Sequence, residues 1–214
     1  MACNASNLPT SNLISSLLAS LAVFNTPASH FLRLYRTSPT SPAGATKVER
    51  LCVSVAVFNP AGHVLLVQRA AHDDWMPHRW EFPGGAIEMQ RDESVLAGAA
   101  RELWEETGLA TKEVVRFIPQ GAGQGEWPEG AYMFYFEERW YCHLAFEVEV
   151  GTCEAVRLDP KEHRGFAWAA EEEVMAQVMA DGRRIDMTTE KMWQLAMKAF
   201  RLRCEKAEEE KTEG

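Results

Sequence analysis

The feature that most constrains the fold is an acid-rich segment, residues 84–109, in which a Gly-Gly pair is followed by a run with helical spacing. The run predicts a helix from Asp92 to Thr107, with Asp92 as its N-cap and Gly108 as its C-terminal stop. Apolar residues recur on one face of this helix: Leu96, Ala99, Ala100 and Leu103. The segment therefore predicts a helix that packs on a sheet and leaves its acidic residues at the edge of a cleft.

Three glutamates crowd one side of the predicted helix. At about 100° per residue, Glu102, Glu105 and Glu106 fall within an arc of about 100°. Their mutual repulsion lowers helix stability unless a cation lies against them, and carboxylate oxygens are ligands that Mg²⁺ and Mn²⁺ prefer. Arg101 precedes Glu105 by one helical turn and can orient that carboxylate. A solvated acidic helix face is the alternative interpretation.

The turn before the helix adds to this evidence. Pro83-Gly84-Gly85 stands where a short predicted strand ends. Glycine permits a positive φ and a close approach of the backbone to a ligand, and its carbonyl oxygen can bind a hard cation. A simple Gly-Gly turn is the alternative for this stretch alone, and it is the ordered combination of turn and acidic helix that favours a cation site.

Taken together, the turn and the helix resemble the Nudix box, whose pattern is G-x5-E-x7-R-E-U-x-E-E-x-G-U, where U is a bulky apolar residue. Every fixed position from Glu93 onward is matched, by Glu93, Arg101-Glu102-Leu103, Glu105-Glu106 and Gly108-Leu109. The departure is earlier, because seven residues instead of five separate Gly85 from Glu93. We interpret this difference as a two-residue insertion in the loop, which affects the placement of Glu88.

The resemblance implies an α+β fold of the Nudix type, an α/β/α sandwich with a mixed β-sheet between helices. It also implies a pyrophosphohydrolase, dependent on Mg²⁺ or Mn²⁺, that cleaves the diphosphate linkage of a nucleoside diphosphate derivative or a nucleoside triphosphate. The site residues that it implies are Glu102, Glu105, Glu106 and the carbonyl of Gly85 as metal ligands, Arg101 as the residue that orients a ligand, and Glu93 as support for the loop–helix junction.

The catalytic base varies within this family and often lies outside the helix. Glu105 is the first candidate among the glutamates of the box. Glu162 is the second, because the stretch from Lys161 to Trp168 is similar to one found late in many family members; a solvated loop carboxylate is the alternative for it. His163 is expected to be a structural loop residue. Further loop acids that could serve are Glu126, Glu129, Glu137 and Glu138.

The whole chain predicts mixed strands with a central helix and a terminal one, which by itself favours helices on both faces of a mixed sheet. Residues 51–58 and 63–68 read as the two strands of a hairpin around the turn 59–62. The other predicted strands are 80–82, 113–118, 132–136, 140–150 and 165–168, and the other predicted helices are 171–179 and 189–206.

Three regions are expected along the chain. Residues 1–47 form an N-terminal extension with a short amphipathic helix at 12–21 and a Ser/Pro-rich linker at 38–44. Residues 48–204 form the Nudix hydrolase domain, and residues 205–214 form a charged C-terminal tail that is expected to fray. The extension lacks acidic residues, so it is interpreted either as a segment docked on the domain or as an organellar address.

The formal net charge of −9 argues against a nucleic acid polymer as partner, because binding phosphates needs a basic surface. The five cysteines show no CxxC pair, which is typical of a reduced intracellular protein. No apolar run is long enough to span a bilayer, so no membrane partner is expected. The expected location is cytoplasmic, with the mitochondrion as the alternative.

The expected substrate is a small nucleotide-like diphosphate. Aromatic residues that cluster in residues 127–141 could stack on a base, although alternating aromatics on strands are usually core residues. Two other functions use the same fold: a catalytically silent nucleotide-binding or sensor module, and an isomerase of isoprenoid diphosphates. The complete set of box acids favours hydrolysis over both, and no cysteine is placed convincingly for the isomerase.

Overall fold

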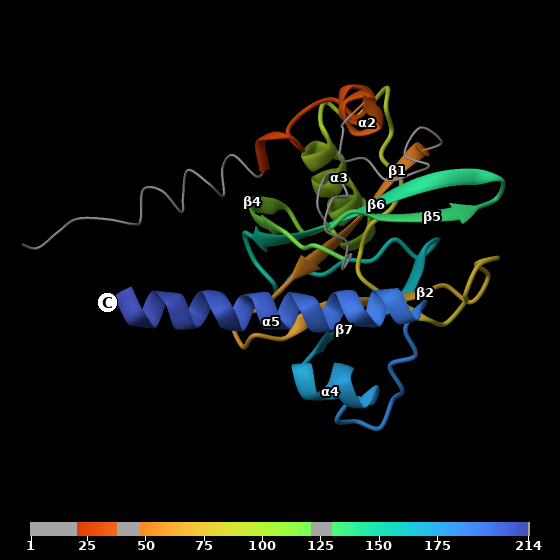
Figure 1. The fold of residues 1–214 in the computed structure, drawn as a ribbon. Helices are drawn as coiled ribbons and strands as arrows, with labels where there is room; N and C mark the ends of the chain where they lie inside the picture. Colours follow the sequence, from red (N-terminus) through yellow and green to blue (C-terminus); the bar gives the residue numbers. More distant parts are fainter. Residues whose placement is uncertain (1–20, 38–47, 121–129, 214) are drawn as a thin grey trace, which may run out of the picture.

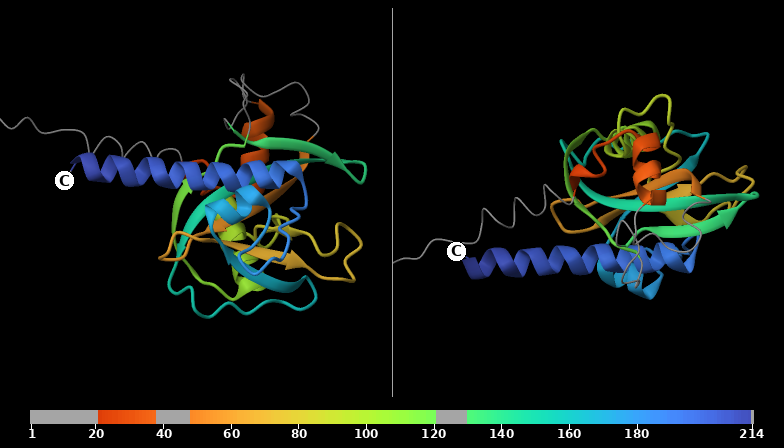
Figure 2. Two further views of the ribbon diagram at one scale, coloured as in Figure 1. Left: turned by 90° about the horizontal axis from the view of Figure 1, so that it is seen from below. Right: turned by 45° about the horizontal axis from the view of Figure 1, so that its top comes forward.

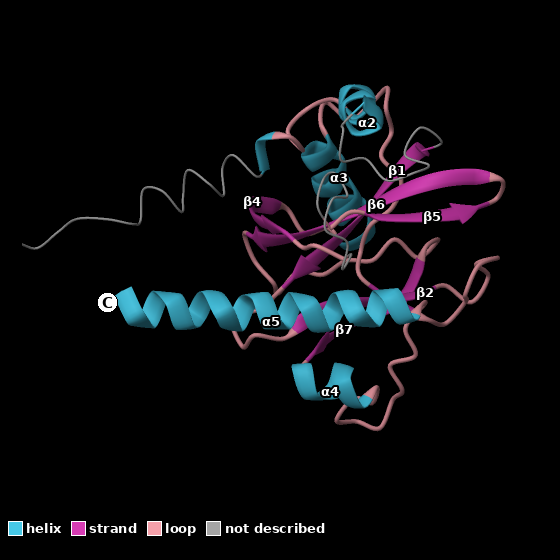
Figure 3. Cartoon of the chain, viewed as in Figure 1, coloured by secondary structure: helices cyan, strands magenta, loops and turns pink. Residues whose placement is uncertain are grey.

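The structure is a computed structural model that describes residues 21–37, 48–120 and 130–213. Strands form the middle of the molecule, with α2 (Ala28–Thr37) and α3 (Val95–Thr107) on one side and α4 (Glu171–Ala176) and α5 (Glu190–Glu213) on the other (Figure 1). Helices thus cover both faces of the strands (Figure 3). The predicted α+β, α/β/α arrangement is confirmed.

The larger sheet is mixed. Its centre is β6 (Arg139–Val150), which runs parallel to β1 (Val48–Val57). On its other edge β6 pairs antiparallel with β5 (Tyr132–Phe136) through its first residues and with β4 (Thr111–Phe117) through its last. The long strand β6 therefore holds the sheet together.

The smaller sheet corrects one expectation. It is antiparallel, in the order β3 (Trp80–Glu81), β2 (Val64–Arg69), β7 (His163–Ala169). The predicted hairpin between residues 51–58 and 63–68 was wrong, because β1 and β2 belong to different sheets and meet at the turn, through the bridge between Phe58 and Val64. The chain turns between them but pairs each strand elsewhere.

From Leu51 onward, strand β1 is buried on both faces, which explains its nearly continuous apolar sequence. Val53 and Val55 point into a core that also contains residues of α2, α3 and β6. Ala56 points into a second core, shared with α4 and α5. Because successive side chains of a strand face opposite ways, one strand serves both cores.

The helix α3 begins later than predicted. Its N-cap is Ser94, whose hydroxyl accepts a hydrogen bond from the backbone N–H of Ala97. Asp92 is therefore not the cap and makes other contacts, described below. Gly108 ends the helix in the left-handed conformation, as expected.

An unpredicted helix, α2, packs beside α3. Its apolar residues follow helical spacing and are buried: Ala28, Phe31, Leu32 and Tyr35. The segment before it also reaches α3, since the carbonyls of Phe24 and Thr26 accept hydrogen bonds from the N–H groups of Leu96 and Val95. These are first-turn N–H groups without partners inside the helix. The predicted helix at 12–21 and the linker at 38–44 lie, except for residue 21, outside the described residues.

The C-terminal helix α5 crosses the lower face of the molecule and extends beyond it (Figure 2). It continues to Glu213, past the predicted end at residue 206. Its apolar residues from Leu195 to Phe200 pack in the second core. Within the described ranges, none of the helices combines the length and hydrophobicity needed to span a bilayer.

Candidate active site

The buried face of α3 carries two of the three glutamates of this helix. Its buried residues recur at helical spacing: Val95, Gly98, Ala99, Glu102, Leu103, Glu106 and Thr107. Glu102 and Glu106 therefore continue the apolar stripe towards the sheet, whereas Glu105 lies at the edge of that face and remains partly exposed. Helical geometry thus divides the three acids into a buried pair and one outer carboxylate.

Glu106 lies against the Gly-Gly turn. Its Oε2 accepts a hydrogen bond of 2.9 Å from the N–H of Gly84, and only 3% of the residue is exposed. Burial raises the pKa of Glu106 well above its ordinary value, and the nearby carboxylates of Glu162 and Glu81 raise it further. The protein environment of Glu106 therefore disfavours its charge.

Glu102 contacts the next glycine. A Cβ atom on Gly85 would lie 2.7 Å from Oε2 of Glu102, so a larger residue would displace the carboxylate. Glu102 also accepts a hydrogen bond of 2.9 Å from Nη1 of Arg101. Burial still outweighs that interaction and raises the pKa of Glu102. The predicted ligand atom of Gly85, its carbonyl oxygen, accepts a hydrogen bond of 2.9 Å from the N–H of Val53.

Strand β1 positions the turn itself. The N–H groups of Val53 and Val55 donate to the carbonyls of Gly85 and Pro83, so the turn runs along the free edge of β1. Gly84 has φ +153°, and a Cβ atom there would lie 2.1 Å from the carbonyl oxygen of Val53. Only glycine allows this close approach.

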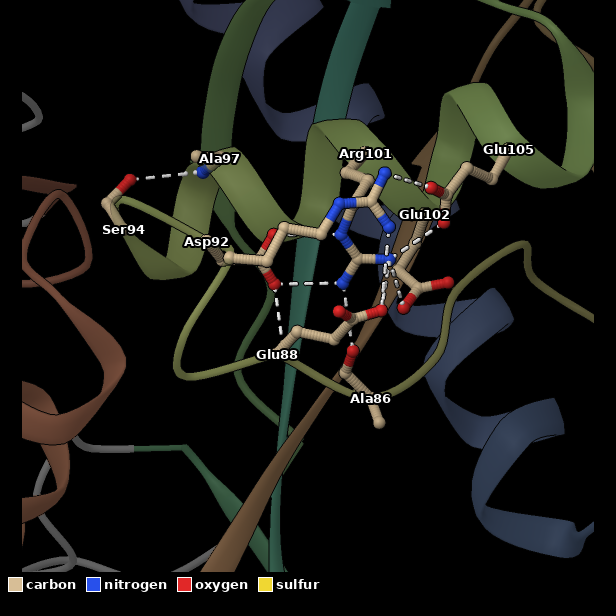
Figure 4. Close-up of polar contacts among 9 residues, drawn as sticks. Ala86, Glu88, Asp92, Ser94, Ala97, Arg101, Glu102 and Glu105 are labelled. Atoms are coloured by element: carbon tan, nitrogen blue, oxygen red, sulfur yellow. Dashed lines mark hydrogen bonds and ion pairs between the residues drawn. The ribbon is translucent and has the colours of Figure 1, made fainter.

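Arg101 joins the loop to the helix (Figure 4). Its guanidinium donates two hydrogen bonds to Asp92 and one to the carbonyl of Ala86. The predicted contact with Glu105 is present, at 2.9 Å. Arg101 therefore holds the loop of residues 86–92, called here the inserted loop, in one network with Glu102 and Glu105.

Of the two neighbouring loop acids, Asp92 and not Glu93 contacts Arg101. Asp92 is 7% exposed, and its Oδ2 also accepts a hydrogen bond from the N–H of Glu88. Glu93, which was expected to support the loop–helix junction, is exposed. From sequence, Asp92 was expected to be the N-cap of the helix, and no local pattern indicates its contact with Arg101.

Glu105 differs from the two buried glutamates. Burial alone would raise its pKa, but hydrogen bonds and charge from Arg101 and Arg91 outweigh burial and lower it. Arg91, from the inserted loop, lies 2.7 Å from Oε1 of Glu105. The Glu105 carboxylate is therefore ionised and fixed on the outer side of the site.

A distant loop brings two more residues to Glu106. The carbonyls of Glu106 and Thr107 accept hydrogen bonds from the N–H groups of Asp159 and Arg157, and the carbonyl of Asp159 accepts from the N–H of His163. The end of α3 therefore holds this loop. As a result, Glu106, Glu162 and His163 each place one possible ligand atom within 4.8 Å of the others.

Glu81 completes the acidic cluster from β3. Its Oε1 lies 2.7 Å from Nη1 of Arg69, which neutralises part of the charge. Glu81 was missed because its strand is only two residues long and its position beside the helix depends on sheet pairing. Of the other loop acids considered, Glu137 and Glu138 form the exposed β5–β6 turn, and residues 126 and 129 lie outside the described ranges.

The donor set fits a hard divalent cation. Glu102, Glu106 and Glu162 offer carboxylate oxygens, which suit Mg²⁺ and Mn²⁺. Burial has raised the pKa of both Glu102 and Glu106, so a bound cation would stabilise charges that the protein alone disfavours.

A cavity of about 420 Å³ opens beside the Gly-Gly turn. Its walls include Gly84 and Gly85 and a set of aromatic side chains: Trp75, Phe82, Tyr132, Phe134, Tyr135, Phe136 and Tyr141. From sequence, alternating aromatic residues on strands were expected to be mostly core residues. Tyr135 is 59% exposed, so that expectation is wrong for this residue. Trp127 lies outside the described residues, and Trp140 contacts Tyr135.

The polar part of the cavity wall is a short hydrogen-bonded chain. Nε2 of His143 lies 2.9 Å from the hydroxyl of Ser54, and its Nδ1 lies 2.7 Å from Oε1 of Gln120. Gln120 donates back to the carbonyl of His143, which orients its amide. Burial lowers the pKa of His143 to about 4, so the ring is neutral and rigidly held.

Comparison with known proteins agrees with this geometry. The sequence model of the NUDIX domain matches residues 48–188. An RNA pyrophosphohydrolase of Acidiphilium cryptum is 33% identical over 129 residues, which cover 58% of this chain and 75% of that protein. One of Bartonella quintana is 42% identical over 71 residues, 31% of this chain and only 40% of that protein.

A solved structure shows the same fold. The MutT protein of Methanosarcina mazei superposes with a TM-score of 0.53 at 23% identity, covering 73% of this chain and 96% of that one. The residues that the family model matches contain the turn, the helix α3 and the loop before β7.

Proposed function

The chain belongs to the Nudix family, and from this premise we propose that it is a metal-dependent hydrolase that cleaves the diphosphate linkage of a nucleoside diphosphate derivative or a nucleoside triphosphate. The observation that carries the proposal is the gathering of carboxylates against the Gly-Gly turn. Glu106 lies on Gly84, Glu102 lies on Gly85, and Glu162 joins them from a loop held by the end of α3.

The cation would supply charge neutralisation of the diphosphate and acidification of a water. Glu102, Glu106 and Glu162 would hold it, with the carbonyl of Gly85 as a further oxygen donor. Arg101 would act as a positioning residue, because it fixes Glu102 and Glu105 and ties the inserted loop to the helix. These contacts support a preorganised site.

Two carboxylates are candidates for the base that takes a proton from the attacking water. Glu105 is ionised and fixed by two arginines, which makes it available but weakly basic. Glu162 is exposed and lies close to Glu106 and Glu102, which places it where it could reach a water at the site. Single-turnover reactions of Glu105→Gln and Glu162→Gln at saturating cation, together with the Kd for the cation in each variant, separate a lost base from a lost ligand.

The aromatic cavity supports a nucleotide-like substrate. Its rings line the same cavity as Gly84 and Gly85, so a base stacked there would place its phosphates near the acidic cluster that lies against these glycines. Some relatives are named RNA pyrophosphohydrolases, which makes a 5′-triphosphate end of RNA a substrate to test. The net charge of −9 favours a small nucleotide over a long polymer.

The proposal is tested by a substrate screen with purified protein. Nucleoside triphosphates, nucleotide sugars, ADP-ribose, dinucleoside polyphosphates and a 5′-triphosphate oligonucleotide are each incubated with Mg²⁺, with Mn²⁺ and with a chelator. We expect cation-dependent release of phosphate products from at least one class, and loss of release in Glu106→Gln. Glu113→Gln, at an exposed position of β4, is the matched control that keeps activity.

The same screen separates the main alternative, a catalytically silent sensor module. A sensor would bind one of these nucleotides, as a rise in melting temperature, and give no product with either cation. Binding without turnover across the panel would overturn the hydrolase proposal.

A further inference from the structure

His163 is a buried histidine without a hydrogen bond from its ring. Its side chain is 3% exposed, and Nδ1 is a buried atom with no partner in the part of the chain that the structure describes. Nε2 lies 3.7 Å from Oε1 of Glu81, which is too far for a hydrogen bond. A buried polar atom without a partner costs free energy, so its presence points to a group that would satisfy it.

Glu81 does not account for His163. The same Oε1 atom of Glu81 already lies 2.7 Å from Nη1 of Arg69, whose guanidinium also pairs with Asp73. The charge of Glu81 is therefore matched by a closer cation. The ring of His163 remains available for another interaction.

The ring faces two carboxylates. One ring nitrogen of His163, one oxygen of Glu106 and one oxygen of Glu162 all lie within 4.8 Å of one another. Two ligands, each about 2.1 Å from one ion, are at most about 4.2 Å apart. Small side-chain adjustments would therefore bring all three atoms into one coordination shell.

The backbone fixes this arrangement from two sides. The N–H of His163 donates to the carbonyl of Asp159, whose own N–H donates to the carbonyl of Glu106. On the other side, the carbonyl of Glu162 accepts from the N–H of Ala70 at the end of β2. His163 and Glu162 are therefore held at a set distance from the end of α3, as a ligand pair requires.

We propose that His163 is a nitrogen ligand of the divalent cation, completing with Glu106 and Glu162 a mixed nitrogen–oxygen site. The inference rests on the proposed function, because it concerns the cation of the same site. It adds a residue outside the Nudix box, and it changes which metals the site would hold.

A nitrogen ligand shifts the metal preference. Mg²⁺ prefers oxygen ligands and retains its waters, whereas imidazole suits Mn²⁺ and later transition metals. The site with His163 would bind Mn²⁺ more tightly than Mg²⁺, and removing the ring would reduce that difference. A site made only of carboxylates has no such dependence on residue 163.

The test measures the metal and not only turnover. Pulsed electron paramagnetic resonance of the full chain loaded with Mn²⁺ should show ¹⁴N coupling from a directly bound imidazole. His163→Gln should abolish that coupling and raise the Kd for Mn²⁺ by about tenfold or more, while the Kd for Mg²⁺ changes far less. His63→Gln, at the opposite end of β2, is the matched control and should keep the coupling.

Two further variants keep the inference falsifiable if His163→Gln fails to fold. His163→Asn is smaller and provides a second replacement at the same position. Glu162→Gln, at an exposed position, should weaken Mn²⁺ binding and retain the ¹⁴N coupling, because the ring stays in place.

The outcomes separate this inference from the proposed function. Mn²⁺ binding and diphosphate hydrolysis without ¹⁴N coupling would overturn the role of His163 and leave the hydrolase proposal intact. Coupling that survives in a folded His163→Gln variant would also overturn it. Absence of both cation binding and hydrolysis in the wild-type chain would instead overturn the proposed function.

Discussion

Asp92 accepts two nearly equal hydrogen bonds from Arg101, from Nε to Oδ1 and from Nη2 to Oδ2, each 2.8 Å long. This fork is mostly shielded from solvent, with side-chain exposures of 3% for Asp92 and 11% for Arg101. Burial alone would raise the pKa of Asp92, but the hydrogen bonds from Arg101 and from the N–H of Glu88 lower it. The inserted loop therefore supplies the carboxylate that anchors the arginine of the box.

The first prediction follows from this pair. Asp92→Asn should lower the free energy of unfolding by about 2 kcal/mol, because it removes the most buried of the carboxylates that Arg101 contacts, while Glu102 and Glu105 remain as its charge partners. It should also lower kcat, since Arg101 positions Glu102 and Glu105. Urea unfolding and steady-state kinetics measure the two effects.

The neighbouring acid is the control for Asp92. Glu93→Gln removes one negative charge in the same loop at an exposed position, and should change stability by less than about 0.5 kcal/mol. Equal losses in both variants would show that the Arg101–Asp92 contact has no special role.

The second prediction concerns Glu106 in metal-free protein. Its folded-state pKa is raised by burial and by neighbouring acids, so above the ordinary value of 4.5 the folded state binds more protons than the unfolded state. Its contribution to stability is therefore lost as the pH rises from 4.5 towards the raised pKa. Glu106→Gln should be more stable than wild type at pH 7, by about 1 kcal/mol or about 2–4 °C in Tm.

Added Mn²⁺ should reverse this order. The wild-type chain gains stability from binding the cation, whereas the variant has lost a ligand and gains less. Thermal unfolding at pH 4.5 and pH 7, with chelator and with Mn²⁺, measures the effect. A variant that is less stable than wild type in every condition would contradict the crowding of acids described for this site.

The third prediction concerns His143 in the cavity wall. Its folded-state pKa is lowered by burial from 6.5 to about 4, so between these values the unfolded state binds more protons. Stability should therefore fall as the pH decreases from 6.5 towards 4, by about 2–4 kcal/mol for this group. In His143→Gln the same decrease should be smaller by that amount.

Urea unfolding of wild type and variant across this pH range checks the difference. The comparison at each pH cancels contributions from the acidic residues, which titrate in both proteins. Parallel stability curves would mean that His143 is protonated in the folded state or is exposed to solvent.

The fourth prediction concerns the segment before β1. Removing residues 1–37 should lower Tm by about 6 °C or more, because it exposes the core around Phe24, Phe31 and Tyr35 and removes two carbonyls that cap α3. Removing only residues 1–20 keeps all of these contacts. A truncation at 37 that melts like the full chain would show that this segment does not support the domain.

The box helix could be predicted from sequence because its signals are local. The spacing of Glu102, Leu103 and Glu106, and the glycine stop at 108, fix its position without reference to the rest of the chain. Its first residue was misplaced because Asp92 and Ser94 can both act as caps, and only the tertiary contact with Arg101 decides between them. The helix α2 was missed, although Phe31 and Tyr35 show helical spacing, because Ser and Pro dominate the composition around it.

The remainder of the site depends on contacts between distant segments. The approach of Glu162 and His163 to Glu106 requires hydrogen bonds at the end of α3, which no local pattern reports. Aromatic residues alternate along β5 and β6, and the same alternation is expected whether the rings face a core or a cavity. The sequence pattern therefore could not show that Tyr135 lines an open pocket. The β1–β2 hairpin was wrong because a turn signal shows where the chain reverses, not which strands pair.

The attachment of residues 157–159 to the end of α3 limits where this protein can change length. Residues 151–156 precede the attachment and are largely exposed, so extra residues there would bulge into water without moving Glu162. A single extra residue between Asp159 and Glu162 would rotate the carboxylate out of reach of Glu106. Insertions in this surface loop should therefore leave the position of Glu162 unchanged on one side of Arg157 and change it on the other.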